Sequence, residues 1–300
     1  MKLYNVLRGH LAILAVVFMS ICFLMSLNSS AFASTKPKGL TLSPLRTELN
    51  IAPGTSQNGV LRITNYSTKP MVVDLSAEVF SVINEQYDYA FTAESNVVKW
   101  VMFSSNEVAL APGETQDVTY AVGVPLSAEP GGRYISLFAS TDANKTTSGV
   151  ESRQQVASLL YITVLGNVSR TGHLVSLTSP WLISGDSIWE MALQDTGTTH
   201  YDSRYSMQID DLLWNGTVFS SSGEALILPG TIRLISNKLP APAWPGLYRV
   251  VYFIGLGDNP AVTKTRLVLY MPIWATILVA ILIIVLIYRF DLARKNKVRK

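Results

Sequence analysis

The chain has 300 residues, 48% of them hydrophobic, with 24 Lys and Arg against 21 Asp and Glu. The basic residues gather at the two ends, which leaves the long segment between them acidic overall. A nucleic-acid-binding surface is therefore not expected, because such surfaces are strongly basic. The single cysteine, Cys22, also excludes a framework of intrachain disulfides.

Residues 1–33 have the pattern of a secretory signal peptide. Lys2 and Arg8 precede an uncharged apolar run, Leu11–Leu27, and the small residues Ala31 and Ala33 stand where a signal peptidase reads the chain. The pattern predicts export with cleavage after Ala33. Because the apolar run is long, an uncleaved N-terminal anchor is the alternative. Cleavage removes Cys22, and an exported part without cysteine favours a bacterial surface protein over a small secreted eukaryotic domain.

The exported segment is predicted to be all-β. Apolar and polar residues alternate with period two at residues 60–64, 73–79, 117–124 and 187–194, which is typical of half-buried antiparallel strands. Ser158–Leu165 is apolar almost throughout, so it is predicted to be a central strand or one covered on both faces. Between the two hydrophobic ends, the sequence has no sustained helical period.

An internal repeat predicts two similar domains. Residues 110–138 and 227–253 each contain a Pro-Gly turn, a strand, a second Pro-Gly turn and a Tyr-containing strand. We therefore expect two tandem Ig-like β-sandwiches, one over residues 38–166 and one over residues 167–266, divided near Gly166–Thr171. Pro130-Gly131-Gly132-Arg133 is interpreted as a turn, because it lacks the frame of a phosphate-binding loop.

The stretch MALQDTGTTH, residues 191–200, contains the tripeptide that carries the catalytic carboxylate of aspartic proteases. Such an enzyme needs two carboxylates sharing a proton, and this chain has one Asp-Thr-Gly and no Asp-Ser-Gly. Gln194 precedes Asp195 where that motif has apolar residues. A strand over Ser187–Gln194 that ends in a turn at Asp195 is therefore the favoured interpretation.

No cofactor or metal site is predicted. His173 and His200 lie far apart in the sequence, without a nearby His or Cys that would complete a zinc site. Both are expected on the surface or in turns, and no nucleophile elbow accompanies them. Trp181, Trp214 and Trp244 are possible ligand-contacting residues, because flat aromatic faces pack against sugars, although tryptophan is also common in sandwich cores.

Leu267–Tyr288 is an uncharged run long enough for a transmembrane helix. Trp274 and Tyr288 are placed as interface anchors, and the basic residues of 289–300 predict a cytoplasmic tail by the positive-inside rule. The sequence thus predicts a single-pass membrane protein whose N-terminal domains lie outside, in contact with the lipid bilayer through Leu267–Tyr288.

Several motifs resemble those of known families. The first domain resembles the first Ig-like domain of bacterial WxL-interacting surface proteins, and it is similar in plan to the first domain of pilus chaperones. The residues that carry this resemblance begin at Leu42 and read LSPLRTELNIAPGTSQNGVLRITNYSTKPMVVDLSAEVF. Asp195-Thr196-Gly197-Thr198-Thr199-His200, Leu228-Pro229-Gly230 and Pro245-Gly246-Leu247-Tyr248 resemble the turn motifs of a related second domain. The resemblance implies cell-wall contact by the first domain and protein contact by the second.

The combined prediction is a non-enzymatic, membrane-anchored binding or scaffold protein at the bacterial cell surface. It would contact a cell-wall polymer or another surface protein through its Ig-like domains. The alternatives are an accessory subunit of a membrane complex and, less favoured, a membrane-anchored hydrolase that uses Asp195 or a site at His173 and His200.

Overall fold

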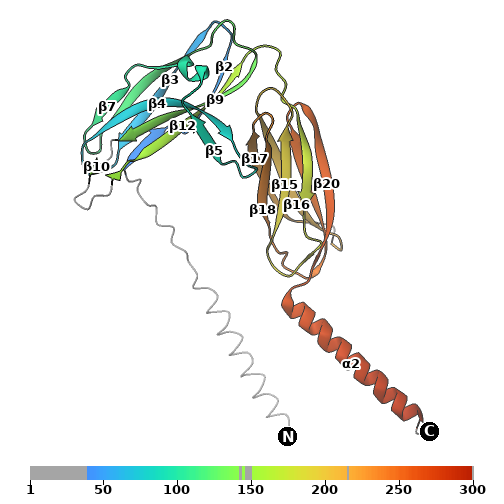
Figure 1. Cartoon of the computed structure of the whole chain (residues 1–300). Coiled ribbons are helices and arrows are strands. Elements are labelled where there is room, and N and C mark those ends of the chain that lie inside the picture. Colours follow the sequence, from blue (N-terminus) through green and yellow to red (C-terminus); the bar gives the residue numbers. More distant parts are fainter. Residues whose placement is uncertain (1–38, 142–143, 146–150, 215, 299–300) are drawn as a thin grey trace. The chain divides into compact units, whose positions relative to one another are not determined.

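The computed structural model describes residues 39–141, 144–145, 151–214 and 216–298. The predicted signal peptide, residues 1–33, lies outside these residues. Antiparallel strands dominate the described chain and form β-sandwiches (Figure 1). The all-β fold class predicted from the alternation is therefore confirmed, and a short 3₁₀ helix, η1 (Asn96–Trp100), was not predicted.

The first sandwich pairs a sheet of order β1-β3-β8-β6 with a sheet of order β2-β12-β9-β4-β5, in which β7 also pairs with β4. A short pair, β10 and β11, stands apart from both sheets. The strands are β1 (Leu40–Ser43), β2 (Arg46–Ile51), β3 (Ser56–Asn65), β4 (Met71–Val82), β5 (Tyr89–Thr92), β6 (Val101–Phe103), β7 (Glu107–Leu110), β8 (Thr115–Gly123), β9 (Gly131–Thr141), β10 (Asn144–Lys145), β11 (Glu151–Ser152) and β12 (Gln155–Val164).

The position of strand β12 explains why its sequence is apolar almost throughout. It lies between β2 and β9, and its residues Leu160–Val164 are buried on both faces. Leu160 and Ile162 face the core of the first sandwich, whereas Tyr161 and Thr163 face residues of the second. The nearly continuous apolar run therefore reflects two covered faces, as predicted.

The second sandwich pairs a sheet of order β13-β15-β18 with a sheet of order β14-β20-β19-β16-β17. The strands are β13 (Gly172–Thr178), β14 (Leu182–Ile183), β15 (Ser187–Asp195), β16 (Tyr201–Asp211), β17 (Thr217–Ile227), β18 (Ile232–Leu239), β19 (Gly246–Leu256) and β20 (Asn259–Tyr270). In β15, Trp189, Met191 and Leu193 are buried in the core, on the face predicted from their spacing.

The two copies of the repeat occupy matching places. In each, a strand of the smaller sheet (β8 or β18) is followed by a strand of the larger sheet (β9 or β19). The preceding Pro-Gly turns put Gly113 and Gly230 at positive φ, 77° and 72°, a conformation that glycine adopts without strain. Gly246 differs from this expectation, because it begins β19 and does not have positive φ.

The predicted membrane segment begins later than expected. Leu267–Tyr270 form the end of β20, hydrogen-bonded to β19, and the helix α2 (Ile273–Val298) starts after Pro272. The start of the predicted helix was wrong because the apolar run continues without a break from strand to helix. In the part of the chain that the structure describes, no helix has both the length and the apolar composition needed to cross a membrane.

Candidate binding cleft and edge strand

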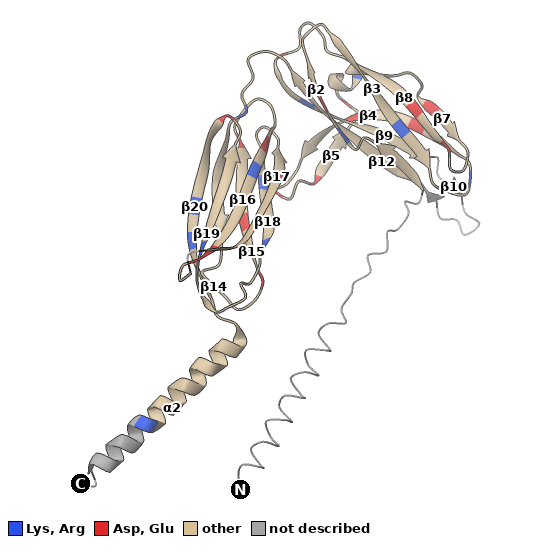
Figure 2. Cartoon of the chain, turned by 180° about the vertical axis from the view of Figure 1, so that it is seen from behind, with Lys and Arg blue, Asp and Glu red and all other residues tan. Residues whose placement is uncertain are grey.

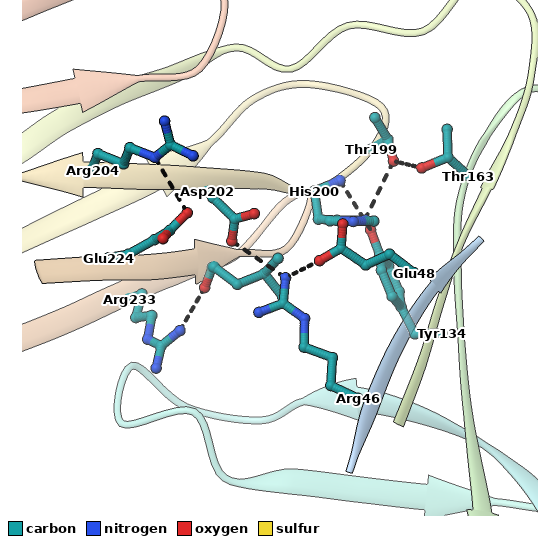
Figure 3. A network of polar contacts seen from close by, with 11 residues as sticks. Arg46, Glu48, Tyr134, Thr163, Thr199, His200, Asp202, Arg204, Glu224 and Arg233 are labelled. Carbon is teal, nitrogen blue, oxygen red and sulfur yellow. Dashed lines mark hydrogen bonds and ion pairs between the residues drawn. The ribbon is translucent and has the colours of Figure 1, made fainter. Parts of the chain in front are cut away.

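A polar network joins the two sandwiches (Figure 3). The phenolic oxygen of Tyr134 accepts a hydrogen bond from the backbone N–H of His200 at 3.1 Å and lies 3.3 Å from the imidazole Nδ1. The hydroxyls of Thr163 and Thr199 are 3.0 Å apart, and the N–H of Gly132 donates to the carbonyl of Thr198 at 2.9 Å. The turn after β15 is thus held against β9 and β12.

Aromatic packing surrounds this network. Phe80, Tyr87 and Tyr161 of the first sandwich form one buried cluster with Leu226 and Leu228 of the second. The Tyr87 oxygen accepts a hydrogen bond from the N–H of Leu228 at 2.8 Å and lies 2.8 Å from the hydroxyl of Thr231. Because a buried N–H left without a partner is costly, this tyrosine both fills space and satisfies the second sandwich's backbone.

Arg46 forms a charged bridge at the rim of the junction. Its guanidinium contacts the carboxylates of Glu48 and Asp202, the latter at 3.3 Å, and lies 4.9 Å from the centroid of the Tyr161 ring. The side chains of all three charged residues are substantially exposed, so the bridge orients the rim more than it stabilises the fold.

A cleft of about 310 Å³ opens beside this network. Its lining is mostly polar and includes Glu48, Asn50, Arg170, His200, Asp202 and Asp258. Such a lining offers hydrogen bonds to a polar ligand. Among the described residues, no group of three or more His, Cys, Asp and Glu side chains is arranged to hold a metal ion.

His200 lies in the turn between β15 and β16, one of the two positions predicted for it, but it is not at the surface. It is 7% exposed and packs edge-on against Tyr134 and Tyr161, with ring centroids 5.6 and 5.4 Å away. Burial lowers its pKa below 6.5, because desolvation penalises the charged imidazolium. Its exposure could not be predicted because the side chains that cover it come from residues far away in the sequence, whereas His173 is exposed on β13 as predicted.

Asp195 ends β15 and starts a turn, as predicted from Asp-Thr-Gly. Its Oδ1 accepts a hydrogen bond from the N–H of Gly197 at 2.6 Å. The carboxyl is fully buried, and burial raises its pKa to about 7. Its Oδ2 has no hydrogen-bond partner among the described residues. Burial, and not a neighbouring carboxylate, raises the pKa of Asp195, whereas a protease site needs two carboxylates that share a proton.

None of the three tryptophans named in the sequence analysis lines this cleft. Trp181, Trp214 and Trp244 lie in loops and are 71%, 85% and 72% exposed. They are therefore not part of a sandwich core. Trp189 fills that role in the second sandwich at 2% exposure.

Strand β17 is a long sheet edge. It pairs with β16 from Ile227 to Thr217, and no other described strand pairs with it. The carbonyl of Leu226 accepts a hydrogen bond from Arg233, and the N–H of Leu228 donates to Tyr87. Backbone groups alternate in direction along a strand, so the even-numbered residues 220–224 also turn theirs away from β16, up to the register shift at Val218. These groups form a row to which another strand can bond.

Among known proteins, similarity was found to solved structures only. No family model and no curated protein matches the chain. The class 5 fimbriae chaperone CfaA is 9% identical, with a TM-score of 0.39 over 76% of this chain and 99% of that one. A chain from the CsuC–CsuE pilus chaperone–subunit complex of Acinetobacter baumannii is 9% identical, with a TM-score of 0.39 over 77% and 99%.

A family 123 glycoside hydrolase from Clostridium perfringens is also similar over 42% of this chain and 27% of its own length, at 13% identity and a TM-score of 0.31. These likenesses concern the fold alone, and no role of a residue follows from them. Pilus chaperones are also one of the two kinds of protein that the sequence motifs resemble. The likeness to WxL-interacting proteins stays a prediction.

Proposed function

We propose that this protein is a non-enzymatic binding protein that holds an extended segment of a partner protein along the edge of β17. The observation that carries this proposal is the row of outward-facing backbone groups on the edge of Ser220–Glu224, to which no described strand is paired. An added strand satisfies such groups by main-chain hydrogen bonds, and its alternating side chains provide specificity.

The side chains of β17 support the proposal. Sheet edges are usually protected against pairing by lysine, proline or strong charge. Thr217–Glu224 instead contains one charged residue, Glu224, which lies 3.5 Å from Arg204, together with three serines and the exposed Val218 and Phe219. This edge therefore accepts a neighbouring strand of low charge and mixed apolar and small residues.

The inter-sandwich cleft supplies a second part of the same site. Its junction residues fix β16 and β17 relative to β9 and β12 through the Tyr134–His200 and Tyr87–Leu228 hydrogen bonds. A partner strand that runs along β17 toward Ile227 arrives at the Phe80 cluster and the rim beside Arg46. The polar cleft then offers partners for the end or a polar side chain of that segment.

The first test is a proline substitution. Ser222→Pro removes an N–H that points away from β16, so we expect the sheet to keep its thermal stability and the partner segment to be lost. Ser221→Pro removes an N–H that bonds to β16 and should lower the melting temperature. Ser220→Ala, on the same outer row, is the matched control and should behave as the natural chain.

Partner capture is measured by photo-crosslinking from p-benzoylphenylalanine at Val218, in cells that produce the protein naturally, with the linked peptide sequenced. The same crosslink in the Ser222→Pro chain, at unchanged melting temperature, contradicts the proposal. Binding to purified peptidoglycan, measured in parallel, tests the cell-wall polymer predicted from the family resemblance.

For location, we propose that α2 attaches the protein to a membrane, with the sandwiches on the outer side. Support comes from the uncharged residues Ile273–Tyr288, most of whose side chains are about half exposed or more, and from the basic residues that follow in the sequence. Replacing α2 by an unrelated apolar helix tests this role. A pure anchor keeps both membrane retention and partner capture, whereas an accessory subunit recognised through α2 loses its complex.

A further inference from the structure

We infer that the end of the second sandwich next to α2 docks on the surface of a lipid bilayer through Trp181, Trp214 and Trp244. This inference rests on the membrane attachment proposed above and extends it from the helix to the folded domain. Three separate loops carry these residues, and the strand pairing shows that all three loops lie at the same end.

The first loop is tied to the end of β20. Trp181 precedes β14, whose Leu182 and Ile183 pair with Leu269 and Tyr270. The carbonyl of Trp181 accepts a hydrogen bond from the N–H of Leu269 at 2.7 Å. Figure 2 shows β14 at the end of this sandwich from which α2 leaves.

The second loop, between β16 and β17, is fixed at the same end. Asp211, the last residue of β16, stands opposite Tyr248 near the start of β19. The N–H of Leu212 donates to the carbonyl of Leu247 at 3.3 Å, and the N–H of Trp214 donates to the carboxylate of Asp211 at 3.1 Å. These bonds hold Trp214 in a tight turn.

The third loop joins β18 to β19. Gly246, the first residue of β19, stands opposite Tyr270, the last residue of β20. Tyr248 donates its hydroxyl to the carbonyl of Trp244 at 2.7 Å. Helix α2 starts beside these loops, because the N–H of Met271 donates to the carbonyl of Ile183 at 2.9 Å.

The chemistry of this end fits a membrane interface. The three tryptophan residues are 71–85% exposed, and the exposed residues Leu182, Leu213 and Leu247 follow or precede them by one to three positions in the sequence. Tryptophan concentrates at the headgroup level of bilayers, because its ring is apolar and its N–H still finds a hydrogen-bond partner there.

The charges of this end are largely matched. Asp186 and Lys238 form an ion pair at 2.7 Å, and the carboxylate of Asp211 accepts the backbone N–H groups of Leu213 and Trp214. Continuity with α2 selects the occupant, since Ile273 and Trp274 begin the apolar helix within three or four residues of the last strand and are themselves 69% and 50% exposed. The apolar helix therefore begins at the same end of the sandwich as the three tryptophan loops.

The test uses the full chain reconstituted in liposomes of phosphatidylcholine and phosphatidylglycerol that contain brominated lipids, which quench nearby indole fluorescence. The natural chain is compared with a triple variant, W181F/W214F/W244F, which keeps Trp274 as a reporter on α2. We expect brominated lipids to quench the fluorescence of the triple variant clearly less than that of the natural chain. The difference between the two chains should be larger with bromines near the headgroups than with bromines deep in the bilayer.

A matched control places a new reporter away from this end. Phe253→Trp in the triple variant puts an indole at a 48%-exposed position in the middle of β19, opposite Thr263, where no added quenching is expected. Equal melting temperatures establish that each variant is folded.

Three outcomes separate the proposals. Quenching that remains unchanged in the triple variant shows insertion of α2 without docking of the loops and overturns this inference alone. No quenching in either chain overturns membrane attachment as well. Saccharide binding that is lost in W181A/W214A/W244A, without lipid quenching, assigns the tryptophans to a sugar and also rejects the inference. Partner capture along β17 is independent of all three outcomes.

Discussion

The two ends of the second sandwich use aromatic surroundings in opposite ways. At one end, His200, Leu226 and Leu228 are buried in a group of aromatic side chains from the first sandwich, Phe80, Tyr87, Tyr134 and Tyr161. The buried backbone N–H groups of His200 and Leu228 have hydrogen-bond partners there. At the other end, three tryptophans are left exposed in short loops. The first sandwich thus covers one end of the second sandwich, and we infer that lipid covers the other end.

This difference predicts where substitutions change stability and where they change binding. Loss of an aromatic side chain at the junction leaves a cavity or an unpaired buried group. Loss of an exposed tryptophan leaves neither. Four substitutions test this contrast, in order of decreasing expected effect on the free energy of unfolding.

Phe80→Ala should have the largest effect. Phe80 is 2% exposed and packs against Tyr134 and Tyr161, with centroid distances of 5.8 and 5.5 Å. Removal of a buried phenyl ring typically costs about 3–5 kcal/mol. Urea unfolding measures the loss, and a change below about 1 kcal/mol would show that the cluster does not pack tightly in solution.

Asp195→Asn should change the dependence of stability on pH. The pKa of Asp195 is raised from 3.8 to about 7, so the protonated carboxyl's contribution is complete below pH 3.8 and is lost as the pH rises to about 7. Asparagine removes this loss, and the variant should be more stable at pH 8 by at most about 4 kcal/mol. Oδ1 of the amide can still accept the hydrogen bond from Gly197.

His200 makes stability depend on pH in the opposite direction, and it serves as the internal reference. Its pKa is lowered from 6.5 by burial, so its contribution is present above pH 6.5 and is lost as the pH falls through the lower folded value. Asp195→Asn should therefore leave the decline on the acid side and remove the decline toward pH 7. Parallel stability curves for the two chains between pH 4 and pH 8 would contradict the burial of Asp195.

Tyr87→Phe should have an intermediate effect. The variant keeps the ring but leaves the N–H of Leu228 without its acceptor in a buried place, which costs about 1–3 kcal/mol. Tyr66→Phe is the matched control, because Tyr66 is 50% exposed and should change stability very little. Equal effects of the two substitutions in chemical denaturation would remove the distinction between a junction tyrosine and a surface tyrosine.

Trp214→Ala should have the smallest effect on stability, within about 0.5 kcal/mol, because its side chain is 85% exposed. Its effect should instead appear in lipid contact, as a loss of quenching by brominated lipids. A large loss of melting temperature would show that Trp214 belongs to the fold, and the contrast between the two ends would then disappear.

Much of the fold could be predicted because period-two alternation reports directly on burial in a sandwich. Val73 in β4 and Met191 in β15 are buried as their spacing indicates. The junction could not be predicted in this way, since Tyr134 and His200 are 66 positions apart. The one available signal was β12, whose second covered face had to pack against something outside the first core.

Other features could not be predicted from the sequence, for different physical reasons. Asp-Thr-Gly correctly predicted a turn, but a turn motif does not say whether its carboxyl is buried. Tryptophan is common both in cores and at surfaces, so sequence alone did not separate Trp189 from Trp214. Apolar character also continues across the end of β20 into α2, and hydropathy does not mark where hydrogen bonding changes from sheet to helix.

Strand β20 also acts as a spacer of defined length. At one end, Asp258, which precedes its first residue, lines the inter-sandwich cleft, and at the other end Tyr270 is followed closely by α2. Its 12 residues, at about 3.3 Å each, separate these points by roughly 40 Å. If α2 lies in a bilayer, the length of β20 therefore limits how far the cleft can lie from the membrane surface. Changing that distance requires adding or removing residues in β20 together with their partners in β19.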